Sequence, residues 1–309
     1  MTEHRKRLGR RAGAAAAALG LALAGSLVAG GAAHAAGGEP SDPKRVVYVE
    51  VNGNDLSNVA DYTLAGTDRP AFDAAMIFAA NIDFDTEKKQ AYLSLNDRVT
   101  WTLENAATQI RPLQQRGTKV LLSVLGNHQG AGLANFASRK DAGAFAQQLA
   151  DVVQKYGLDG IDFDDEWSEY GNNGTGQPNA SSFPYLVKEL RTKIGPHKLI
   201  TFYNIGPASE STEYRGISVG ALVDYALNPW YGSWDVPQIA RADASKLAPG
   251  AIDLNRTPVE TAAQFAARTR AEGYGAIVTY DLRAGDHSAY VSAITEPLTG
   301  LATVYAPAP

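Results

Sequence analysis

The sequence predicts an α/β protein that folds as a single (β/α)8 TIM barrel, with some helices shortened or missing after the fifth and sixth strands. After residue 45, short β-rich runs alternate with stretches of helical periodicity along one continuous domain. The chain has no cysteine, so a large core rather than disulfides has to stabilise it. A doubly wound open sheet is the competing fold, but "VNGNDLSN" after the first strand lacks the G-x-G-x-x-G phosphate loop.

The first 35 residues have the pattern of a secretory signal peptide. A basic start, "MTEHRKRLGRR", precedes the apolar run "AGAAAAALGLALAGSLVAG", and small residues end the segment at Ala35. We therefore expect cleavage near Ala35 and a secreted, extracellular protein, exported by either the general or the twin-arginine route. Residues 36–45 are expected to be a flexible leader, and residues 46–309 the catalytic barrel.

Eight strands are expected, and each is a short run rich in aliphatic and aromatic residues bounded by turn-forming residues. Their spacing leaves room for a crossover between consecutive strands, as parallel pairing requires. The ranges are 46–51, 71–82, 119–126, 160–167, 199–205, 223–229, 251–255 and 275–282.

Helices are expected between several of these strands. Apolar side chains recur at helical spacing over 97–116 and over 138–156, and a glycine follows each run. "TPVE", residues 257–260, has the pattern of a capping box with proline at the first helical position. The segments 207–222 and 231–250 are too short or too rich in Gly and Pro for full helices, so we expect abbreviated crossovers there.

The charge balance excludes two classes of partner. The formal net charge is −5, and the basic side chains cluster only in the first 11 residues. An acidic chain without a basic run is a poor ligand for nucleic acid or for an anionic membrane surface. Beyond the first 35 residues, no apolar stretch is long enough to span a bilayer. We therefore expect neither nucleic acid nor a membrane as a partner.

The stretch "YGLDGIDFDDEWSEYG", residues 156–171, places five carboxylates in eight positions. On an extended strand, Asp162, Asp164 and Glu166 share one face, and the apolar residues between them point to the other. The acids would then line the inside of the barrel toward its C-terminal mouth, where barrel enzymes place their chemistry. Three acids so close cannot all ionise in a partly desolvated pocket, and we expect Glu166, nearest the mouth, to be a protonated general acid.

Two other interpretations of this cluster are open from the residues alone. The acids could be a solvated strand end, although buried unpaired acids are rarely structural. Asp-x-Asp-x-Glu could also supply oxygen ligands to a divalent metal. The cluster follows an apolar strand, however, and no glycine provides the turn of a calcium-binding loop. Acid–base catalysis without a metal is the preferred interpretation.

At these residues the sequence resembles glycoside hydrolase family 18, whose signature D-G-x-D-x-D-x-E stands complete as Asp159, Gly160, Asp162, Asp164 and Glu166. The resemblance is narrower to family members of the endoglycosidase H type, and it runs over nearly all of residues 46–305. The stretches that carry it are "FAANI", "QIRPLQQRG", "VLLSVLGNHQGAG", "YGLDGIDFDDE", "EYGNNGT", "YNIGP" and "EGYG".

The resemblance implies an endo-β-N-acetylglucosaminidase that hydrolyses the GlcNAc-β1,4-GlcNAc bond in the core of high-mannose and hybrid N-linked glycans. It implies a retaining mechanism in which the substrate's own 2-acetamido group attacks and forms an oxazolinium ion. Glu166 would act as acid and then as base, Asp164 would hold the acetamido N–H, and Asp162 would share a proton with Asp164. Asp159 would anchor the strand base. We expect glycoprotein N-glycans as partners, a monomer, and neither metal nor cofactor.

The remaining substrate-binding candidates lie at the expected C-terminal ends of other strands or in the loops that follow them. Either Asn228 or Tyr231 would hold the acetamido carbonyl, and the residues do not decide between them. Trp230 and Trp234 could be sugar platforms or ordinary packing residues. A cleft position and a loop position without a role are equally open for His128. The full set is Tyr203, Asn204, Asn228, Trp230, Tyr231, Trp234, Tyr280, Asp281 and His128.

Two rival functions share the strand-four motif. A chitinase of the same family would use the same chemistry, but Ser123-Val124-Leu125-Gly126 replaces its Ser-x-Gly-Gly motif. The segment between 255 and 275 is also too short for the inserted domain of many chitinases. A chitinase-like lectin would bind glycans without cutting them, but such proteins usually lose the terminal glutamate, and Glu166 is present.

Overall fold

The computed structural model describes residues 42–307. The expected signal peptide and residues 36–41 of the expected leader lie outside the described residues. Strand β1 (Lys44–Glu50) begins inside the segment expected to be a leader, so the ordered barrel starts two residues earlier than position 46. Within residues 42–307, no helix has the length and apolarity needed to cross a bilayer.

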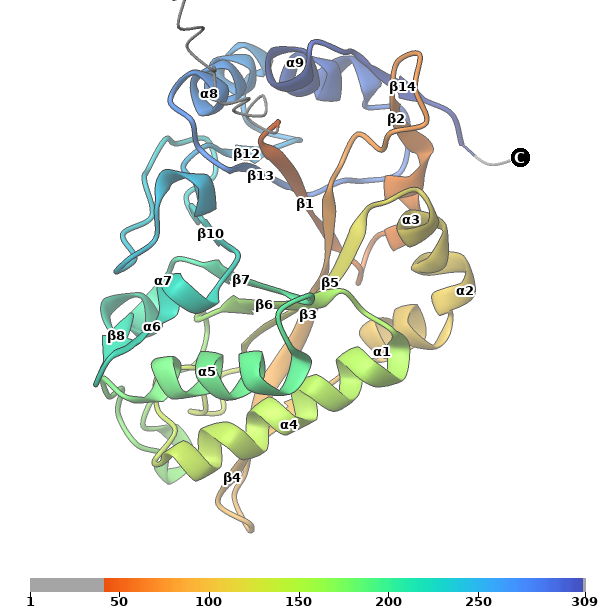
Figure 1. Ribbon diagram of the computed structural model, residues 1–309. Coiled ribbons are helices and arrows are strands. Elements are labelled where there is room, and N and C mark those ends of the chain that lie inside the picture. Colours follow the sequence, from red (N-terminus) through yellow and green to blue (C-terminus); the bar gives the residue numbers. More distant parts are fainter. Residues whose placement is uncertain (1–41, 308–309) are drawn as a thin grey trace, which may run out of the picture. The chain divides into compact units, whose positions relative to one another are not determined.

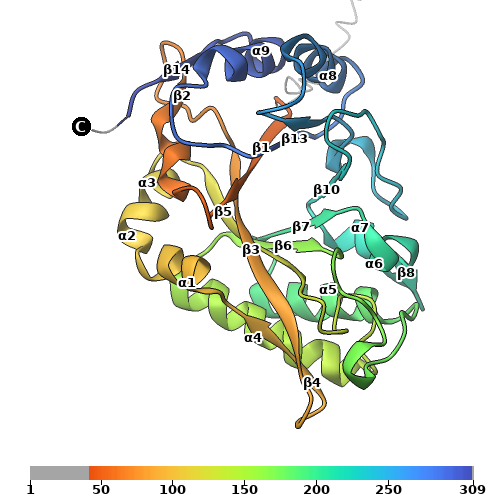
Figure 2. The ribbon, with the colours of Figure 1, turned by 180° about the vertical axis from the view of Figure 1, so that it is seen from behind.

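The barrel is built from parallel strands in the order β11-β10-β7-β6-β5-β3-β1-β13-β12. The strands form a ring with the helices outside it (Figures 1 and 2). This confirms the (β/α)8 prediction. The strands beyond β1 are β3 (Ala74–Asp85), β5 (Lys119–Gly126), β6 (Gly160–Asp164), β7 (Leu199–Tyr203), β10 (Tyr225–Leu227), β11 (Leu247–Ala248), β12 (Ala251–Asp253) and β13 (Ala276–Tyr280).

The seventh barrel strand is divided into two short pieces. Pro249 and Gly250 separate β11, which pairs with β10, from β12, which pairs with β13. Proline cannot donate to a ladder, so the strand is interrupted there, and each piece continues the sheet on one side only. The barrel is therefore nearly closed at this position.

Three antiparallel additions surround the barrel. Strand β4 (Gln90–Ser94) pairs with the end of β3, and this hairpin extends beyond the ring (Figure 1). Strand β2 (Tyr62–Leu64) pairs with β14 (Thr303–Tyr305). Strand β8 (Glu213–Tyr214) pairs with β9 (Ile217–Ser218).

The helices follow the expected pattern with two corrections. The run 97–116 is not one helix: it breaks at Asn105 and at Ile110. The second break precedes Pro112, which has no N–H to continue the ladder. Helix α8 begins at Val259 without the expected capping box, since the Thr257 hydroxyl accepts a hydrogen bond from the Asp253 N–H instead. The helices are α1 (Asp97–Glu104), α2 (Ala106–Gln109), α3 (Arg111–Gln115), α4 (Arg139–Tyr156), α5 (Ser182–Ile194), α6 (Gly206–Glu210), α7 (Val219–Leu222), α8 (Val259–Ala271) and α9 (Ser288–Thr299).

The crossovers after β7 and β10 are short, as expected. Helices α6 and α7 span five and four residues, and a single 3-10 turn, Ala244–Lys246, precedes β11. By contrast, α4 runs for 18 residues between a Ser138 N-cap and Gly157 at a positive φ of 63°. The barrel wall is therefore thicker around β5 and β6 than around β10.

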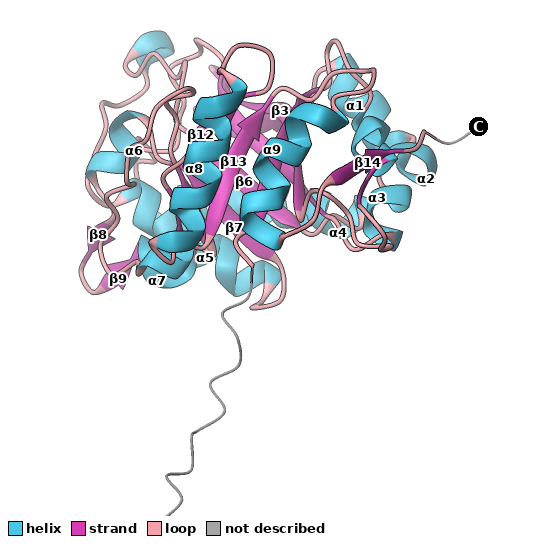
Figure 3. Ribbon diagram, turned by 90° about the horizontal axis from the view of Figure 1, so that it is seen from above, coloured by secondary structure: helices cyan, strands magenta, loops and turns pink. Residues whose placement is uncertain are grey.

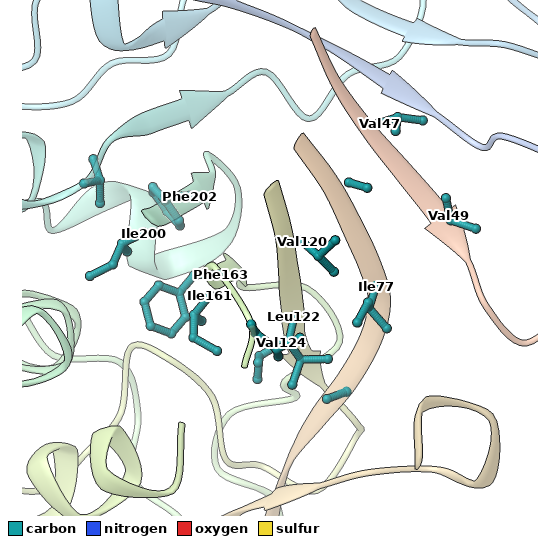
Figure 4. Packing of buried hydrophobic residues seen from close by; sticks show 14 of the residues in the cluster. Val47, Val49, Ile77, Val120, Leu122, Val124, Ile161, Phe163, Ile200 and Phe202 are labelled. Carbon is teal, nitrogen blue, oxygen red and sulfur yellow. The ribbon is translucent and has the colours of Figure 1, made fainter. Parts of the chain in front are cut away.

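Alternation along the strands separates two cores. The outward side chains pack between strands and helices, where Ile161 and Phe163 of β6 lie beside those of neighbouring strands (Figure 4). Helices cover these outer faces when the barrel is seen from above (Figure 3). The inward side chains form a second cluster that includes Val46, Tyr48 and Met76. This alternation leaves Asp162 and Asp164 facing the interior.

Candidate active site

Strand β6 positions the acids in a row that ends just beyond it. Asp162 and Asp164 are 0% and 1% exposed, whereas Glu166 is half-buried. The strand ends at Asp164 rather than at 167 as expected, so Glu166 lies in the following loop. Its backbone holds it there: its N–H donates to Asp164 Oδ1 at 3.1 Å, and its carbonyl accepts from the Gly126 N–H at 2.9 Å.

Asp162 accepts hydrogen bonds from three hydroxyls inside the barrel. Tyr48 and Ser123 donate to Oδ2 at 2.8 Å each, and Thr201 donates to Oδ1 at 2.5 Å. Ser123 and Thr201 reach it because the parallel register aligns them with Asp162 on the neighbouring strands. Burial raises the pKa of Asp162 to about 6, and the three donors oppose that rise.

Asp164 lies in a different environment. The hydrogen bond from the Glu166 N–H is the one that its carboxylate accepts within residues 42–307. Burial raises its pKa well above the ordinary value, and the neighbouring charges of Glu166 and Asp162 raise it further. Both effects favour the neutral form of the Asp164 carboxyl group.

Glu166 has a raised pKa as well, and burial is the cause. A half-buried carboxyl at the mouth can both keep a proton and reach a ligand. The sequence predicts that at least one acid of the row stays protonated, with Glu166 as the candidate. In the structure, burial and like charges also raise the pKa of Asp164, so Asp164 is a second acid of the row in which the neutral form is favoured.

An aromatic pocket of about 190 Å³ opens above the acids. Tyr231 and Tyr280 stack with ring centroids 5.2 Å apart, and Tyr48 meets Tyr203 edge-on at 5.7 Å. Phe78 enters the wall where the register of β3 against β5 shifts between Ile77 and Ala80. Such walls exclude water, which explains the raised carboxyl pKa values. The lining residues are Tyr48, Phe78, Asp164, Glu166, Trp167, Tyr203, Tyr231 and Tyr280.

The structure separates the two strand-six candidates. Tyr231 lines the pocket. Asn228 is fully buried, and its amide donates to the Pro249 carbonyl at 2.7 Å while its Oδ1 accepts from the Trp230 N–H at 2.9 Å. Asn228 thus serves the loop after β10 and the broken seventh strand, and Tyr231 is the residue placed to meet a ligand.

Some of the expected residues are brought to the mouth and others are not. Trp230 is 55% exposed, so its ring is free to meet a ligand. Trp234 packs instead against Phe265 and Tyr274, with centroids 5.8 and 5.7 Å away, on the side of α8. Asp281 is buried and accepts a hydrogen bond from the Glu50 N–H at 2.9 Å, which joins β1 to β13.

Two further candidates lie in loops at the same end of the barrel. His128 Nδ1 lies 2.6 Å from Glu169 Oε1, and its ring is 5.7 Å from that of Trp167. Asn204 follows Tyr203 on β7, and among residues 42–307 its buried Oδ1 has no hydrogen-bond partner. An unpartnered acceptor beside the pocket is available to a ligand donor.

Three pocket residues were missed from sequence. Tyr48 could have been found, because alternation along β1 puts it inside together with Val46. Phe78 could not, since the register shift that turns it inward has no sequence signal. Trp167, 60% exposed, directly follows Glu166 and could have been suspected as a platform from that position alone.

Carboxylates in a row also raise the question of a cation. Within residues 42–307, no three His, Cys, Asp or Glu side chains are grouped so that they could hold a metal ion. The deepest acid already accepts three hydroxyl hydrogen bonds. The arrangement is one that holds and moves protons.

Comparison with known proteins agrees with this geometry. The family model "Glycosyl hydrolases family 18" matches residues 44–237. An endo-beta-N-acetylglucosaminidase from Flavobacterium sp. (strain SK1022) is 51% identical over 265 residues, which cover 86% of this chain and 83% of that protein. Endo-beta-N-acetylglucosaminidase F1 from Elizabethkingia meningoseptica is 36% identical over 193 residues, 61% of this chain and 56% of its own.

A solved structure has the same architecture. The crystal structure of Bacteroides thetaiotamicron EndoBT-3987 with Man5GlcNAc product superposes with a TM-score of 0.76 at 26% identity. The match covers 87% of this chain and 63% of that one. The chain therefore belongs to family 18 of the glycosyl hydrolases and is a glycoside hydrolase close to the endo-β-N-acetylglucosaminidases of the endoglycosidase H type.

Proposed function

We propose that the enzyme hydrolyses the GlcNAc-β1,4-GlcNAc bond in the core of high-mannose and hybrid N-linked glycans. The observation that carries this proposal is the pair Asp164 and Glu166, both with raised pKa values, at the floor of an aromatic pocket. The 51% identical Flavobacterium protein bears the name of this activity. A second EndoBT-3987 structure, which superposes with a TM-score of 0.75, is a complex with Man9GlcNAc2Asn substrate.

The first step needs a proton donor and a group that accepts an N–H. Glu166 protonates the glycosidic oxygen as the bond from C1 to that oxygen breaks. The carbonyl oxygen of the 2-acetamido group attacks C1 and forms the oxazolinium ring. Asp164, once turned to the sugar, accepts the acetamido N–H and stabilises the positive charge, and its proton passes toward Asp162.

The second step reverses these roles. Glu166, now a carboxylate, takes a proton from water as the water oxygen attacks C1. The bond from C1 to the acetamido oxygen breaks, the amide is restored, and configuration at C1 is retained. The glycoprotein keeps one GlcNAc and the rest of the glycan leaves.

The pocket walls suit the acetamido group. Tyr231 and Tyr203 stand on the side of the pocket formed by β7 and the loop after β10, with their ring centroids 6.1 Å apart. The Tyr203 hydroxyl donates to the Pro229 carbonyl at 2.8 Å and is itself hydrogen-bonded to the Tyr231 side chain. On this proposal the Tyr231 hydroxyl exchanges that partner for the acetamido oxygen when the substrate binds. The flat aromatic faces that line the pocket favour a cyclic cationic intermediate.

The same proposal covers where the enzyme works. The basic and apolar pattern of residues 1–35, which lie outside the described residues, supports export and cleavage near Ala35. Extracellular glycoproteins would then be the natural substrates.

The experiment is a comparison of two substrates. The purified protein is incubated with a high-mannose glycoprotein and, separately, with a chitin oligomer, and the products are weighed by mass spectrometry. The proposal predicts a glycoprotein that retains one GlcNAc at each glycosylated asparagine and little cleavage of chitin. Cleavage of chitin alone would assign the enzyme to the chitinases.

A further inference from the structure

Asp165 is a buried acid of the 159–166 cluster to which the proposed chemistry gives no role. Asp159 accepts a hydrogen bond from the Val120 N–H at 3.0 Å at the base of β6, and the other three acids face the pocket or the barrel interior. Asp165 is only 4% exposed and has neither a cation beside it nor a place in the pocket lining. A buried carboxylate of this kind needs a reason.

Its carboxylate joins three loops at the mouth of the barrel. Oδ2 accepts from the Ala208 N–H at 2.7 Å, in the helix after β7. Oδ1 accepts from the Leu133 N–H at 3.3 Å, in the loop after β5, and from the Tyr170 hydroxyl in the loop after β6. Ser168 adds a longer contact to Oδ1 at 3.4 Å. Burial raises the pKa of Asp165 to about 6, so the group is mostly ionised at neutral pH.

Two glycines allow these loops to approach so closely. At Gly206, with a φ of +68°, a Cβ would lie 2.2 Å from the Asp165 carbonyl oxygen and 2.9 Å from its Oδ2. At Gly132, a Cβ would lie 2.2 Å from the Ser168 hydroxyl oxygen. The backbone at Gly206 is thus packed against Asp165, and the backbone at Gly132 against the neighbouring Ser168, without room for a side chain at either position.

The segment held in this way carries the general acid. Trp167 and Glu169 have φ values of 59° and 48°, a left-handed conformation that non-glycine residues adopt only when their surroundings impose it. Glu166 lies between the buried Asp165 and this strained stretch. We propose that Asp165 is a positioning residue that joins the loops after β5, β6 and β7 and so holds Glu166 at the pocket. This inference rests on the proposed function, because it assigns Asp165 to the placement of that acid.

The test compares substitutions of the two aspartates that flank β6, Asp159 and Asp165. Asp165→Asn keeps the shape of the side chain but points an amide N–H at a group that already donates a hydrogen bond. Asp159→Asn makes the same chemical change at the opposite end of β6, away from the pocket, and is the matched control. Both variants are assayed with a high-mannose glycopeptide and with an analogue in which 4-nitrophenol replaces the reducing-end GlcNAc. A nitrophenolate leaves without protonation, so its release depends little on the placement of the acid.

We expect Asp165→Asn to lower kcat on the glycopeptide about 30- to 100-fold, with KM changed less than about threefold, because small displacements of a catalytic group cost that much. On the nitrophenyl analogue the loss should stay below about fivefold. Asp159→Asn should lower the unfolding temperature by about as much as Asp165→Asn does, and it should leave kcat unchanged on both substrates. Glu166→Gln gives the reference for complete loss of the acid.

An equal loss on both leaving groups, or an equal loss in Asp159→Asn, would show that Asp165 only stabilises the fold. An unchanged kcat on the glycopeptide would overturn the inference as well. Should Asp165→Asn fail to fold, Tyr170→Phe is used instead, because it removes one of the hydrogen-bond donors to Asp165. The loss of kcat on the glycopeptide is then compared with the loss on the nitrophenyl analogue in the same way. If the wild-type protein leaves the glycopeptide intact, the proposed function fails instead, and that outcome is distinct.

Discussion

Two neighbouring layers of the barrel interior give an aspartate side chain different surroundings. One is the deep layer around Asp162, and the other is the layer around Asp164, one step nearer the mouth. Both aspartates point inward from β6 and both are buried. The deep layer supplies three hydroxyl donors, whereas the outer layer supplies one backbone N–H and aromatic walls. Burial alone therefore does not decide the charge of an acid: the local count of donors does.

This difference gives each acid a separate state at neutral pH. The pKa of Asp162 rises to about 6, so it is mostly ionised. The pKa of Asp164 rises well above its ordinary value through burial and through the charges of Glu166 and Asp162, which favours its neutral form. A proton held next to an ionised acceptor can move without crossing solvent. Substitutions along the row test this contrast, and the greatest loss of activity is expected at its outer end.

The end of the row is tested by Glu166→Gln. The amide cannot donate a proton to the glycosidic oxygen, so kcat on a high-mannose glycopeptide should fall about 10³-fold. Binding of the glycan, measured by calorimetry, should remain within about threefold, because the pocket walls are unchanged. Turnover near the wild-type rate would remove Glu166 from the role of acid.

The outer layer is tested by Asp164→Asn, with Asp162→Asn as its counterpart. We expect kcat to fall about 10²-fold, since an amide cannot accept the acetamido N–H as a carboxylate does. The free energy of unfolding at pH 7 should rise, because folding raises the pKa of this acid well above its ordinary value and the amide removes that cost. Asp162→Asn should stabilise less. Urea titrations would contradict the contrast if Asp164→Asn destabilised the enzyme.

The raised pKa values of the buried acids also predict how the free energy of unfolding changes with pH. The folded-state pKa of Asp162 is about 6 against an ordinary 3.8, so the folded state binds this proton more tightly than the unfolded state. Its stabilising contribution is complete below the ordinary value and is lost as the pH rises through about 6. Asp165, also raised to about 6, adds a second contribution of the same sign. Unfolding free energies across this range should fall less steeply in Asp162→Asn, and an unchanged slope would contradict the assignment.

The smallest effect is expected from Thr201→Val, which removes one donor from Asp162. Losing a hydrogen bond of about 1 kcal/mol to the ionised form should raise the pKa of Asp162 further, by about half to one unit. The acid limb of the pH profile of kcat should move to higher pH by the same amount. Thr279→Val is a matched control, because that hydroxyl donates to the Val46 carbonyl and not to the acids. A shift to lower pH in Thr201→Val would contradict the role of the donors.

Much of the fold and part of the site could be predicted from the sequence. Alternation fixes which residues of β6 face inward, and the apolar runs locate eight strands to within a few residues. The division of the seventh strand at Pro249-Gly250 escaped detection, because each piece is too short to show a pattern. For Trp234 the sequence left a sugar platform and ordinary packing open, because strand ends do not reveal which way the following loop turns, and the structure packs it against Phe265 and Tyr274. Ser123 and Thr201 depend on the register between strands, which the chain alone does not specify.

The central claim, that Asp164 is neutral beside an ionised Asp162, can be measured directly by infrared difference spectroscopy at pH 8. The wild-type enzyme should show the carbonyl band of a neutral carboxylic acid, which disappears in Asp164→Asn and persists in Asp162→Asn. A wild-type spectrum without that band, or a band that disappears only in Asp162→Asn, would contradict the account.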